Sequence, residues 1–259
     1  MTLVRSDVTA AVATVTLDSP HNRNALSAAL MSELLAALAA AVADDAVRVI
    51  VLSHTGPVFC SGADLKETAA TLEQGTQGTV PAGRMGEVLA AVWESPKPVV
   101  ARVGGPARAG GLGLIAAADI AVCSTEATFA FTEVRLGVIP AVISATVLPR
   151  LIPRAAAELF LTGDSFDGTR AAGIGLVTAA VPADELDPTV ARYAGSLVRG
   201  APAALAATKR LLQRGGERAI RHELAELTEK SVTFFASDEG REGVRSFLEK
   251  RDPAWVPRA

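Results

Sequence analysis

Cysteine and aromatic residues are scarce in this sequence. Two of the 259 residues are cysteines, Cys60 and Cys123, and neither has a cysteine or histidine neighbour at metal-ligand spacing. A disulfide framework and a zinc site are therefore not expected. Aromatic residues make up 4% of the chain, whereas apolar residues make up 49% and charged residues 20%. This balance is typical of an ordinary globular protein and excludes disordered and collagen-like chains.

The chain also lacks an excess of charge of one sign and a long apolar run. It has 28 acidic and 25 basic residues scattered along its length, which gives a formal charge of −3. No basic surface is therefore expected for nucleic acid or for an anionic membrane. No uncharged apolar run approaches the ~20 residues of a membrane-spanning helix, and residues 1–7 do not resemble a secretion signal. We expect a cytoplasmic protein with no membrane and no nucleic-acid partner.

What the sequence does contain is a recurring pattern of short apolar strands. Residues 11–17 alternate between apolar and polar, as in a half-buried strand. Residues 47–53 are almost continuously apolar, as in a strand covered on both faces. Between them, Ser27 is placed to cap a helix whose leucines recur every four residues. Further short strands are expected at 99–103, 120–123, 128–131 and 176–181. This order predicts an α/β fold.

The strand pattern stops at about residue 183. After it, helices are expected at 185–199, 202–214, 217–236 and 238–250. Short helices with little sheet to pack on commonly bury their apolar faces against neighbouring subunits. We therefore interpret residues 1–183 as the core that binds ligand and carries the chemistry, and residues 184–259 as a helical oligomerisation region.

Two glycine-containing loops, at 54–63 and 104–113, follow predicted buried strands and lead directly into helices. A strand end, a glycine turn and a helix start together expose backbone N–H groups at the positive end of a helix dipole, where an oxyanion can bind. The alternative is that these glycines only permit tight turns. A third segment, 75–83, is rich in glycine and threonine without apolar periodicity, and we expect a mobile loop there. Mobile loops near sites often act as lids.

Glu133 is the candidate catalytic side chain. It follows the apolar strand expected at 128–131, where a carboxylate is costly unless it is paired or used in chemistry. The alternative is an ion pair with nearby Arg135. Ser61 lacks the flanking glycines of a nucleophile elbow, and Cys60 is interpreted as a small buried hydrophobic residue rather than a nucleophile.

Six segments match, in order, the motifs of one known family. They are Asn-Ala-Leu at 24–26, Phe-Cys-Ser-Gly-Ala-Asp-Leu-Lys-Glu at 59–67, the Pro-Lys-Pro-Val turn at 96–100, the glycine-rich loop at 103–114, Phe-Thr-Glu-Val-Arg-Leu-Gly-Val-Ile-Pro at 131–140, and the segment 235–251, which contains Phe-Leu-Glu-Lys-Arg. Over nearly its full length the sequence therefore resembles the crotonase superfamily, the enoyl-CoA hydratases and isomerases.

The resemblance implies a crotonase-like spiral of ββα units with a helical C-terminal trimerisation region, assembled as a homotrimer or a dimer of trimers. It implies an acyl-CoA thioester as the ligand, with coenzyme A entering as part of the substrate and no separate cofactor or metal. It also implies a place in fatty-acid or branched-chain amino-acid degradation. Carried over residue by residue, it places the thioester oxygen between the backbone N–H groups of Ala63 and Gly110. Adding water at the β-carbon puts negative charge on this oxygen, which two N–H donors stabilise.

The resemblance also assigns residues that bind the substrate and its CoA moiety. They are Ala25, Ser61, Ala63, Asp64, Leu65, Lys66 and Gly110, together with Lys250, which matches a lysine that approaches the CoA phosphates. Arg108 stands where the family commonly has an apolar residue. An arginine that faces the acyl pocket can pair with a substrate carboxylate. The alternative is that Arg108 points to solvent or to an interface.

The sequence departs from the family pattern at the catalytic positions. Hydratases of this family use two glutamates to hold and activate water, and the first is replaced here by Gly113. The second is retained as Glu133, although Thr132 replaces the proline before it. A set of glycines later in the chain has become Ala-Val-Ile at 141–143, so we expect an acyl pocket that differs from that of a straight-chain hydratase.

These observations predict an enoyl-CoA hydratase-like lyase. Its substrate would be a short 2-enoyl-CoA, branched or carboxylated as in a methylglutaconyl thioester, with Glu133 as acid and base. An enoyl-CoA isomerase is the second interpretation, because a single carboxylate suffices to move a proton between two carbons. The third is a catalytically silent acyl-CoA-binding protein that keeps the oxyanion hole but has lost its chemistry with Gly113.

Overall fold

A mainly parallel sheet forms the centre of the fold. The computed structural model describes residues 2–73, 82–213 and 217–256. The sheet has the strand order β1-β2-β3-β4-β6-β9, in which β1 and β2 are antiparallel and the other neighbours are parallel. Its strands are β1 (Val4–Thr9), β2 (Val12–Leu17), β3 (Val49–His54), β4 (Val99–Val103), β6 (Ile120–Ser124) and β9 (Ala179–Val181). A smaller sheet has the order β5-β7-β8, formed by β5 (Ala107–Arg108), β7 (Thr128–Ala130) and β8 (Phe166–Asp167).

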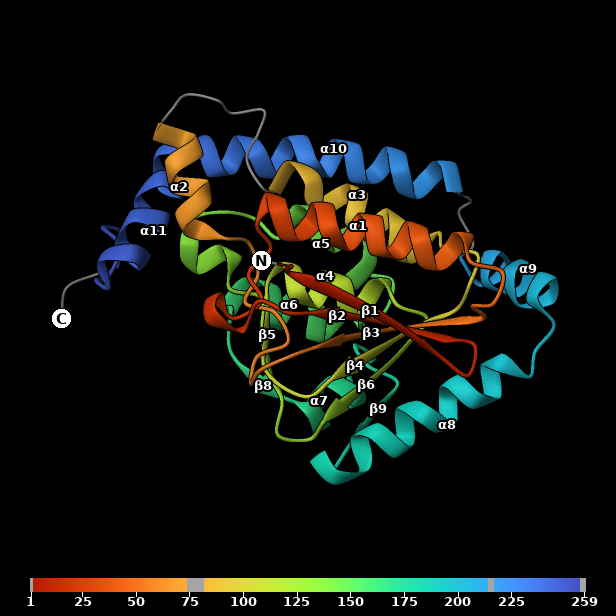
Figure 1. The fold of residues 1–259 in the computed structure, drawn as a ribbon. Coiled ribbons are helices and arrows are strands. Elements are labelled where there is room, and N and C mark those ends of the chain that lie inside the picture. The colour runs from red at the N-terminus through yellow and green to blue at the C-terminus, as the bar shows by residue number, and fades with distance from the viewer. Residues whose placement is uncertain (1, 74–81, 214–216, 257–259) are drawn as a thin grey trace.

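Strand β3 explains why the sheet is covered on both faces. Ile50 and Leu52 belong to the main core, whereas Val49 and Val51 belong to a second apolar cluster. Side chains alternate along a strand, so a run without polar positions needs apolar cover on each side. Helix α8 (Leu186–Val198) supplies the cover for the second cluster. Helix α1 (Ala28–Ala43) packs on β1 and β2 at the opposite face, as Figure 1 shows.

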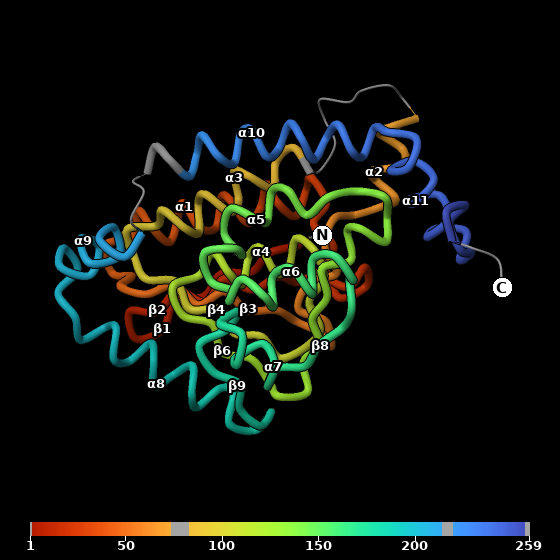
Figure 2. Tube along the Cα trace, turned by 180° about the vertical axis from the view of Figure 1, so that it is seen from behind, coloured from red at the N-terminus to blue at the C-terminus, as the bar shows by residue number. Residues whose placement is uncertain are grey.

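Two further helices are layered on α1. Helix α3 (Ala82–Trp93) packs on α1, and α10 (Glu217–Ala236) packs in turn on α3 and α5 (Figure 2). The other helices are α2 (Leu65–Glu73), α4 (Gly110–Ala117), α5 (Ala141–Val147), α6 (Pro153–Thr162), α7 (Gly168–Gly173), α9 (Pro202–Leu212) and α11 (Asp238–Glu249), with short 3₁₀ turns η1 (Pro20–Asn22), η3 (Glu133–Leu136) and η4 (Ala183–Glu185). No described helix is long and apolar enough to cross a membrane.

The predicted α/β organisation is confirmed. Ser27 caps α1, since its side chain accepts a hydrogen bond from the Leu30 N–H at 3.2 Å. The strand expected at 176–181 is shorter in the structure, because the Leu176 N–H still bonds to the Ala171 carbonyl at the end of α7. Of the mobile loop expected at 75–83, residues 75–81 lie outside the described residues, and the last two begin α3.

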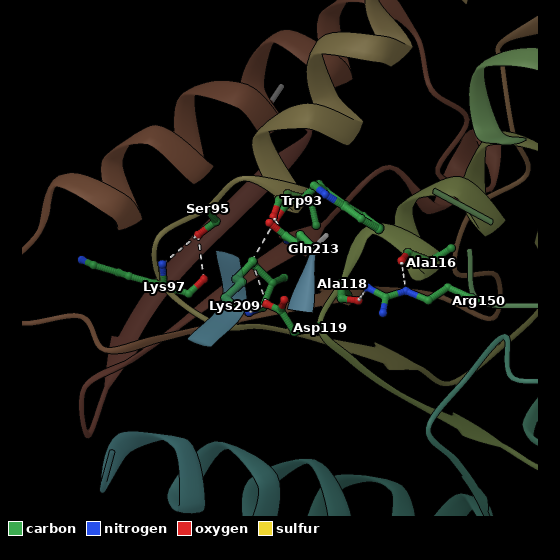
Figure 3. A network of polar contacts seen from close by, with 11 residues as sticks. Trp93, Ser95, Lys97, Ala116, Ala118, Asp119, Arg150, Lys209 and Gln213 are labelled. Atoms are coloured by element: carbon green, nitrogen blue, oxygen red, sulfur yellow. Dashed lines mark hydrogen bonds and ion pairs between the residues drawn. The ribbon is translucent and has the colours of Figure 1, made fainter. Parts of the chain in front are cut away.

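A buried ion pair fastens α9 to the sheet. Lys209 of α9 donates to Asp119 at 2.7 Å, and Asp119 also accepts the Val99 N–H of β4 at 2.8 Å (Figure 3). Arg150 lies nearby, with its guanidinium carbon 4.9 Å from the ring centroid of Trp93. Burial lowers the pKa of Lys209 and raises that of Asp119. If α9 moved away, Asp119 would be left as a buried charge without Lys209 as its partner, which is strongly unfavourable. The pair therefore holds α9 at this position on the sheet.

From Leu186 to Glu249 the described chain is helical, as predicted, but it is not separate from the core. Ile220 and Leu224 of α10 belong to the main hydrophobic cluster. Phe235 and Val244 join a further cluster with α2. The sheet therefore ends near residue 183, whereas the hydrophobic core continues through α10. The expected trimerisation through this region stays a prediction.

Candidate active site

Short strand-like pairings place two loops side by side. The Leu26 N–H donates to the Gly62 carbonyl at 2.8 Å, which pairs Leu26 with Ala63. Cys60 pairs in the same way with Ala107 of β5. The loop after β3 is therefore held between the start of α1 and the segment that leads into α4. This arrangement brings the two glycine-containing loops predicted from the sequence to one place.

Asn24 fixes the first of these loops. It is fully buried, its side-chain oxygen accepts the Ser19 N–H at 2.8 Å, and its amide nitrogen donates to the carbonyls of Thr55 and Val58 at 3.0 and 2.8 Å. Its φ of 53° lies in the left-handed region, which asparagine tolerates better than most residues. The Asn-Ala-Leu motif was visible in the sequence, but its function as a clamp between two loops required the coordinates.

A residue with a strained backbone conformation, Ala109, sets the direction of the second loop where it enters α4. Ala109, just before α4, has φ 47° and ψ −116°, an unusual conformation for a non-glycine residue. Gly110 then begins the helix, so its N–H has no partner within α4. Among the described residues, neither this N–H nor that of Ala63 has a hydrogen-bond partner. A Cβ on Gly110 would lie 2.6 Å from Cε of Met85, so the flexible end of that side chain would have to move to admit a larger residue.

These two residues line one pocket together with Glu133. Its cavity volume is about 60 Å³. The lining residues are Ala63, Met85, Ala109, Gly110, Glu133, Ile139, Pro140, Ala141, Val142, Ile143, Ser231 and Phe235. The two predicted oxyanion residues and the predicted acid–base residue therefore meet at a common cavity with mostly apolar walls.

Glu133 has the properties of a reactive carboxyl group. It begins η3 directly after β7, is only 8% exposed, and its Oε2 has no hydrogen-bond partner among the described residues. Burial raises its pKa to about 7. The alternative of an ion pair with Arg135 is wrong, because Arg135 bonds instead to Asp164 at 2.5 Å and to the Thr162 carbonyl at 3.1 Å.

The place of the missing family glutamate is filled by a neighbour. A Cβ on Gly113 of α4 would lie 2.7 Å from Cγ2 of Ile143 and 3.3 Å from a methyl carbon of Leu89. Ile143 is one of the residues that replace the family's glycines. The two departures from the family pattern, at Gly113 and at Ile143, therefore lie next to each other in space. The isoleucine on α5 occupies the space beside the glycine on α4.

Arg108 has protein partners. Its guanidinium donates to the carbonyls of Ala107 and Thr128 at 2.8 and 2.6 Å and to the Thr128 hydroxyl at 3.1 Å. Burial lowers its pKa. It is not among the residues that line the pocket. The expectation that it meets a substrate carboxylate therefore has no support from the geometry, and its guanidinium instead ties β5 to β7.

The remaining predicted binding residues lie around the loop between Ala63 and α2. Asp64 caps α2, since its carboxylate accepts the N–H groups of Lys66 and Glu67 at 3.1 and 3.2 Å. Leu65 packs in the cluster that includes Phe235, while Ala25 is buried. Ser61 approaches the Asn22 carbonyl at 3.5 Å. The two lysines, Lys66 and Lys250, are exposed on or just beyond α2 and α11, which pack on each other.

Sequence reasoning missed the contribution of α10 to the pocket. Ser231 and Phe235 line the cavity, although the helix was assigned to an oligomerisation region. The available signal was weak: Ser231 follows Thr228 as a second small polar residue on an inward face that also carries the buried Ile220, Leu224 and Phe235. Within the described chain, no group of three histidine, cysteine or acidic residues is arranged to hold a metal ion.

Comparison with known proteins agrees with this fold and identifies a family. The chain matches the family model described as Enoyl-CoA hydratase/isomerase over residues 7–258. The crystal structure of an enoyl-CoA hydratase from Mycobacterium avium is 45% identical, with a TM-score of 0.86 and coverage of 98% of this chain and 99% of that chain. Mevalonyl-coenzyme A hydratase of Aspergillus fumigatus is 32% identical over 249 residues, covering 94% of this chain and 90% of that protein.

A third relative is 2,3-dehydroadipyl-CoA hydratase of Escherichia coli, which is 31% identical over 240 residues, 92% of each chain. The α/β fold is thus that of the crotonase superfamily. The chain belongs to the enoyl-CoA hydratase/isomerase family, and it is an enzyme of that family with an acyl-CoA thioester as its substrate.

Proposed function

We propose that this enzyme adds water to a short 2-enoyl-CoA, with Glu133 as its acid and base and with the N–H groups of Ala63 and Gly110 as its oxyanion hole. One observation carries the proposal: a buried carboxyl group with an unbonded oxygen lines the same small cavity as two unbonded amides. Amides fixed in this way stabilise negative charge that develops on a thioester oxygen, without reorganisation during the reaction.

The chemistry follows from the state of Glu133. Its carboxylate removes a proton from water while the water oxygen bonds to the β-carbon, and the thioester becomes an enolate held by the two amides. The same carboxyl group then returns the proton to the α-carbon. A pKa near 7 suits both transfers, because the group neither holds nor releases the proton too strongly at neutral pH.

The walls of the cavity favour a short acyl group. Val142, Ile143 and Phe235 bound a space of about 60 Å³. A carboxylated substrate of the methylglutaconyl type needs a cation at the acyl end. Neither arginine nor lysine is among the residues that line this cavity, since Arg108 bonds to Thr128. The relatives named for mevalonyl-coenzyme A and 2,3-dehydroadipyl-CoA differ in their acyl groups, so the proposal rests on the cavity rather than on either relative.

The second candidate is an isomerase, and Gly113 favours it. Moving a double bond needs one carboxyl group to carry a proton between two carbons, whereas hydration must also hold a water molecule. With Gly113 in place of a glutamate, Glu133 is the only acidic residue among those that line the cavity. The CoA moiety is proposed to extend past Asp64 and Leu65 toward Lys66 and Lys250 in either case.

A panel of thioesters distinguishes these functions. The purified protein is incubated with crotonyl, 3-methylcrotonyl and 3-methylglutaconyl thioesters of CoA and with their 3-enoyl isomers, while the absorbance of the conjugated enoyl thioester is followed. Loss of this absorbance from the 2-enoyl compounds supports hydration. Its appearance from the 3-enoyl compounds supports isomerisation. Binding without either change would reject both and leave a silent acyl-CoA-binding protein.

A further inference from the structure

Glu133 and Ser231 are the two residues with polar side chains among those that line the cavity. Ser231 lies on α10 and is only 5% exposed. Serine and threonine hydroxyls inside helices commonly bond to the carbonyl four residues earlier. Thr233 of the same helix does so, donating to Glu229 at 2.9 Å. The Ser231 hydroxyl has no hydrogen-bond partner within the described part of the chain.

The position of Ser231 on its helix makes this hydroxyl unusual. The inward face of α10 carries the buried residues Ile220, Leu224 and Phe235, and its other hydroxyl, on Thr228, lies toward Gly86 of α3 and not at the cavity. A hydroxyl that has no protein partner is unfavourable unless the cavity that it lines supplies one. A ligand or a water molecule in the cavity would supply the missing partner.

We propose that Ser231 positions the water molecule that adds to the substrate, in the place of the second carboxylate that Gly113 removes. The inference rests on the proposed hydratase function. Ile143 blocks the side of the cavity next to Gly113, so a water-binding group has to come from another wall. Helix α10 forms such a wall, and Ser231 is its polar residue at the cavity.

A hydroxyl group can hold a water molecule in place without exchanging a proton with it. A serine is too weakly acidic and too weakly basic to exchange protons near neutral pH, so Glu133 remains the proton carrier. The Ser231 oxygen accepts the hydrogen that the water keeps, while Glu133 accepts the hydrogen that the water loses. Two contacts of this kind orient a lone pair of the water oxygen toward the β-carbon. The proton on Glu133 then passes to the α-carbon, so the product contains one added water and both side chains return to their starting state.

The test compares two reactions that share Glu133 and the oxyanion hole but differ in their need for water. The first is hydration of the most rapidly hydrated thioester of the panel. The second is exchange of the α-protons of its saturated analogue in D₂O, followed by mass spectrometry, which requires only enolate formation. We expect Ser231→Ala to slow hydration by about 10- to 100-fold, the effect of losing a hydrogen bond to a partly charged group, and to leave α-proton exchange within about twofold. Ser231→Thr, which restores a hydroxyl, should recover part of the hydration rate.

The matched control is Thr228→Val, which removes a hydroxyl from α10 one turn earlier, beside Gly86 and away from the cavity. It should change neither reaction, and thermal unfolding verifies that all variants fold. Equal losses of hydration and exchange in Ser231→Ala, or no loss of either, would overturn the role of Ser231. A wild-type protein that exchanges α-protons but hydrates no thioester would instead reject the proposed hydratase function and this inference with it.

Discussion

At the scale of single residues, Glu133 is a carboxyl group that is buried without a cation to pair with it in the described part of the chain, a combination that is uncommon in proteins. It is buried among apolar side chains, and it has no cation close enough to pair with it among the described residues. Its position after an apolar strand made it a candidate in the sequence. The sequence did not show that Arg135 would bond to Asp164, because those residues are brought together only by the packing of η3 against the end of α6.

The raised pKa of Glu133 gives the first prediction. At pH below its ordinary value of 4.5 the group is protonated in both the folded and the unfolded protein. As the pH rises toward about 7, the unfolded chain ionises first, so folding becomes less favourable by up to ~3 kcal/mol. Glu133→Gln should therefore raise the thermal midpoint at pH 8 but not at pH 4.

The same variant should lower turnover by about 10²–10⁴-fold while thioester affinity changes little, because an amide keeps the shape but cannot exchange the proton. Unfolding curves at the two pH values and a binding titration check both parts. Full activity in the Gln variant would move the acid–base group elsewhere.

Gly113 and Ile143 give the second prediction. Restoring the family glutamate with Gly113→Glu alone should destabilise the protein, because its Cβ would lie 2.7 Å from Ile143. Overpacking of this kind typically costs about 1–3 kcal/mol. The double variant Gly113→Glu with Ile143→Gly should recover stability and raise hydration of crotonyl-CoA.

The control for this pair is Ile143→Gly alone, which should cost at least the ~2–5 kcal/mol typical of the cavity left when isoleucine becomes alanine. Stability is measured by chemical denaturation and hydration by the absorbance assay. If the single Gly113→Glu variant is as stable as wild type, the two positions do not compete for space.

At the scale of elements, the start of α4 gives the third prediction. Gly110→Pro removes the N–H donor at the first helical position, where proline fits the helix itself, although its added carbons require the end of the Met85 side chain to move. We expect kcat to fall by about 10²–10³-fold, the loss typical of one oxyanion donor. The thermal midpoint shows whether the helix still forms. Undiminished turnover in a folded variant would place the thioester oxygen elsewhere.

Elements with strong local patterns were predictable from the sequence, whereas the shape of the cavity was not. The β-branched run of β3 and the Ser27 cap of α1 express local preferences, and both were predicted close to their observed ends. The exchange between Gly113 and Ile143 joins residues thirty positions apart, and the contribution of Ser231 comes from the last quarter of the chain. Contacts of this kind depend on how helices pack, which a local pattern does not encode.

At the scale of the whole molecule, exposed apolar side chains give the fourth prediction. Leu161 and Leu212 are each 78% exposed and Phe247 is 57% exposed. Association would bury such side chains, and the family resemblance implies a homotrimer or a dimer of trimers. Sedimentation at micromolar concentration should therefore show a trimer or hexamer, whereas a monodisperse monomer would contradict the assembly. Leu212→Glu, with Glu226→Gln as a control on the exposed face of α10, tests whether α9 takes part.

The position of α10 near the end of the chain determines when the cavity can close during synthesis. The sheet, both oxyanion loops and Glu133 precede residue 183, but one wall of the cavity contains Ser231 and Phe235. During translation the nascent chain can form its sheet while that side of the reactive pocket is still open to water. The pocket becomes closed only after α10 has left the ribosome and docked on α3 and α5. A chain truncated before residue 231 would therefore retain the amides and the carboxyl group while lacking the enclosure that makes them reactive.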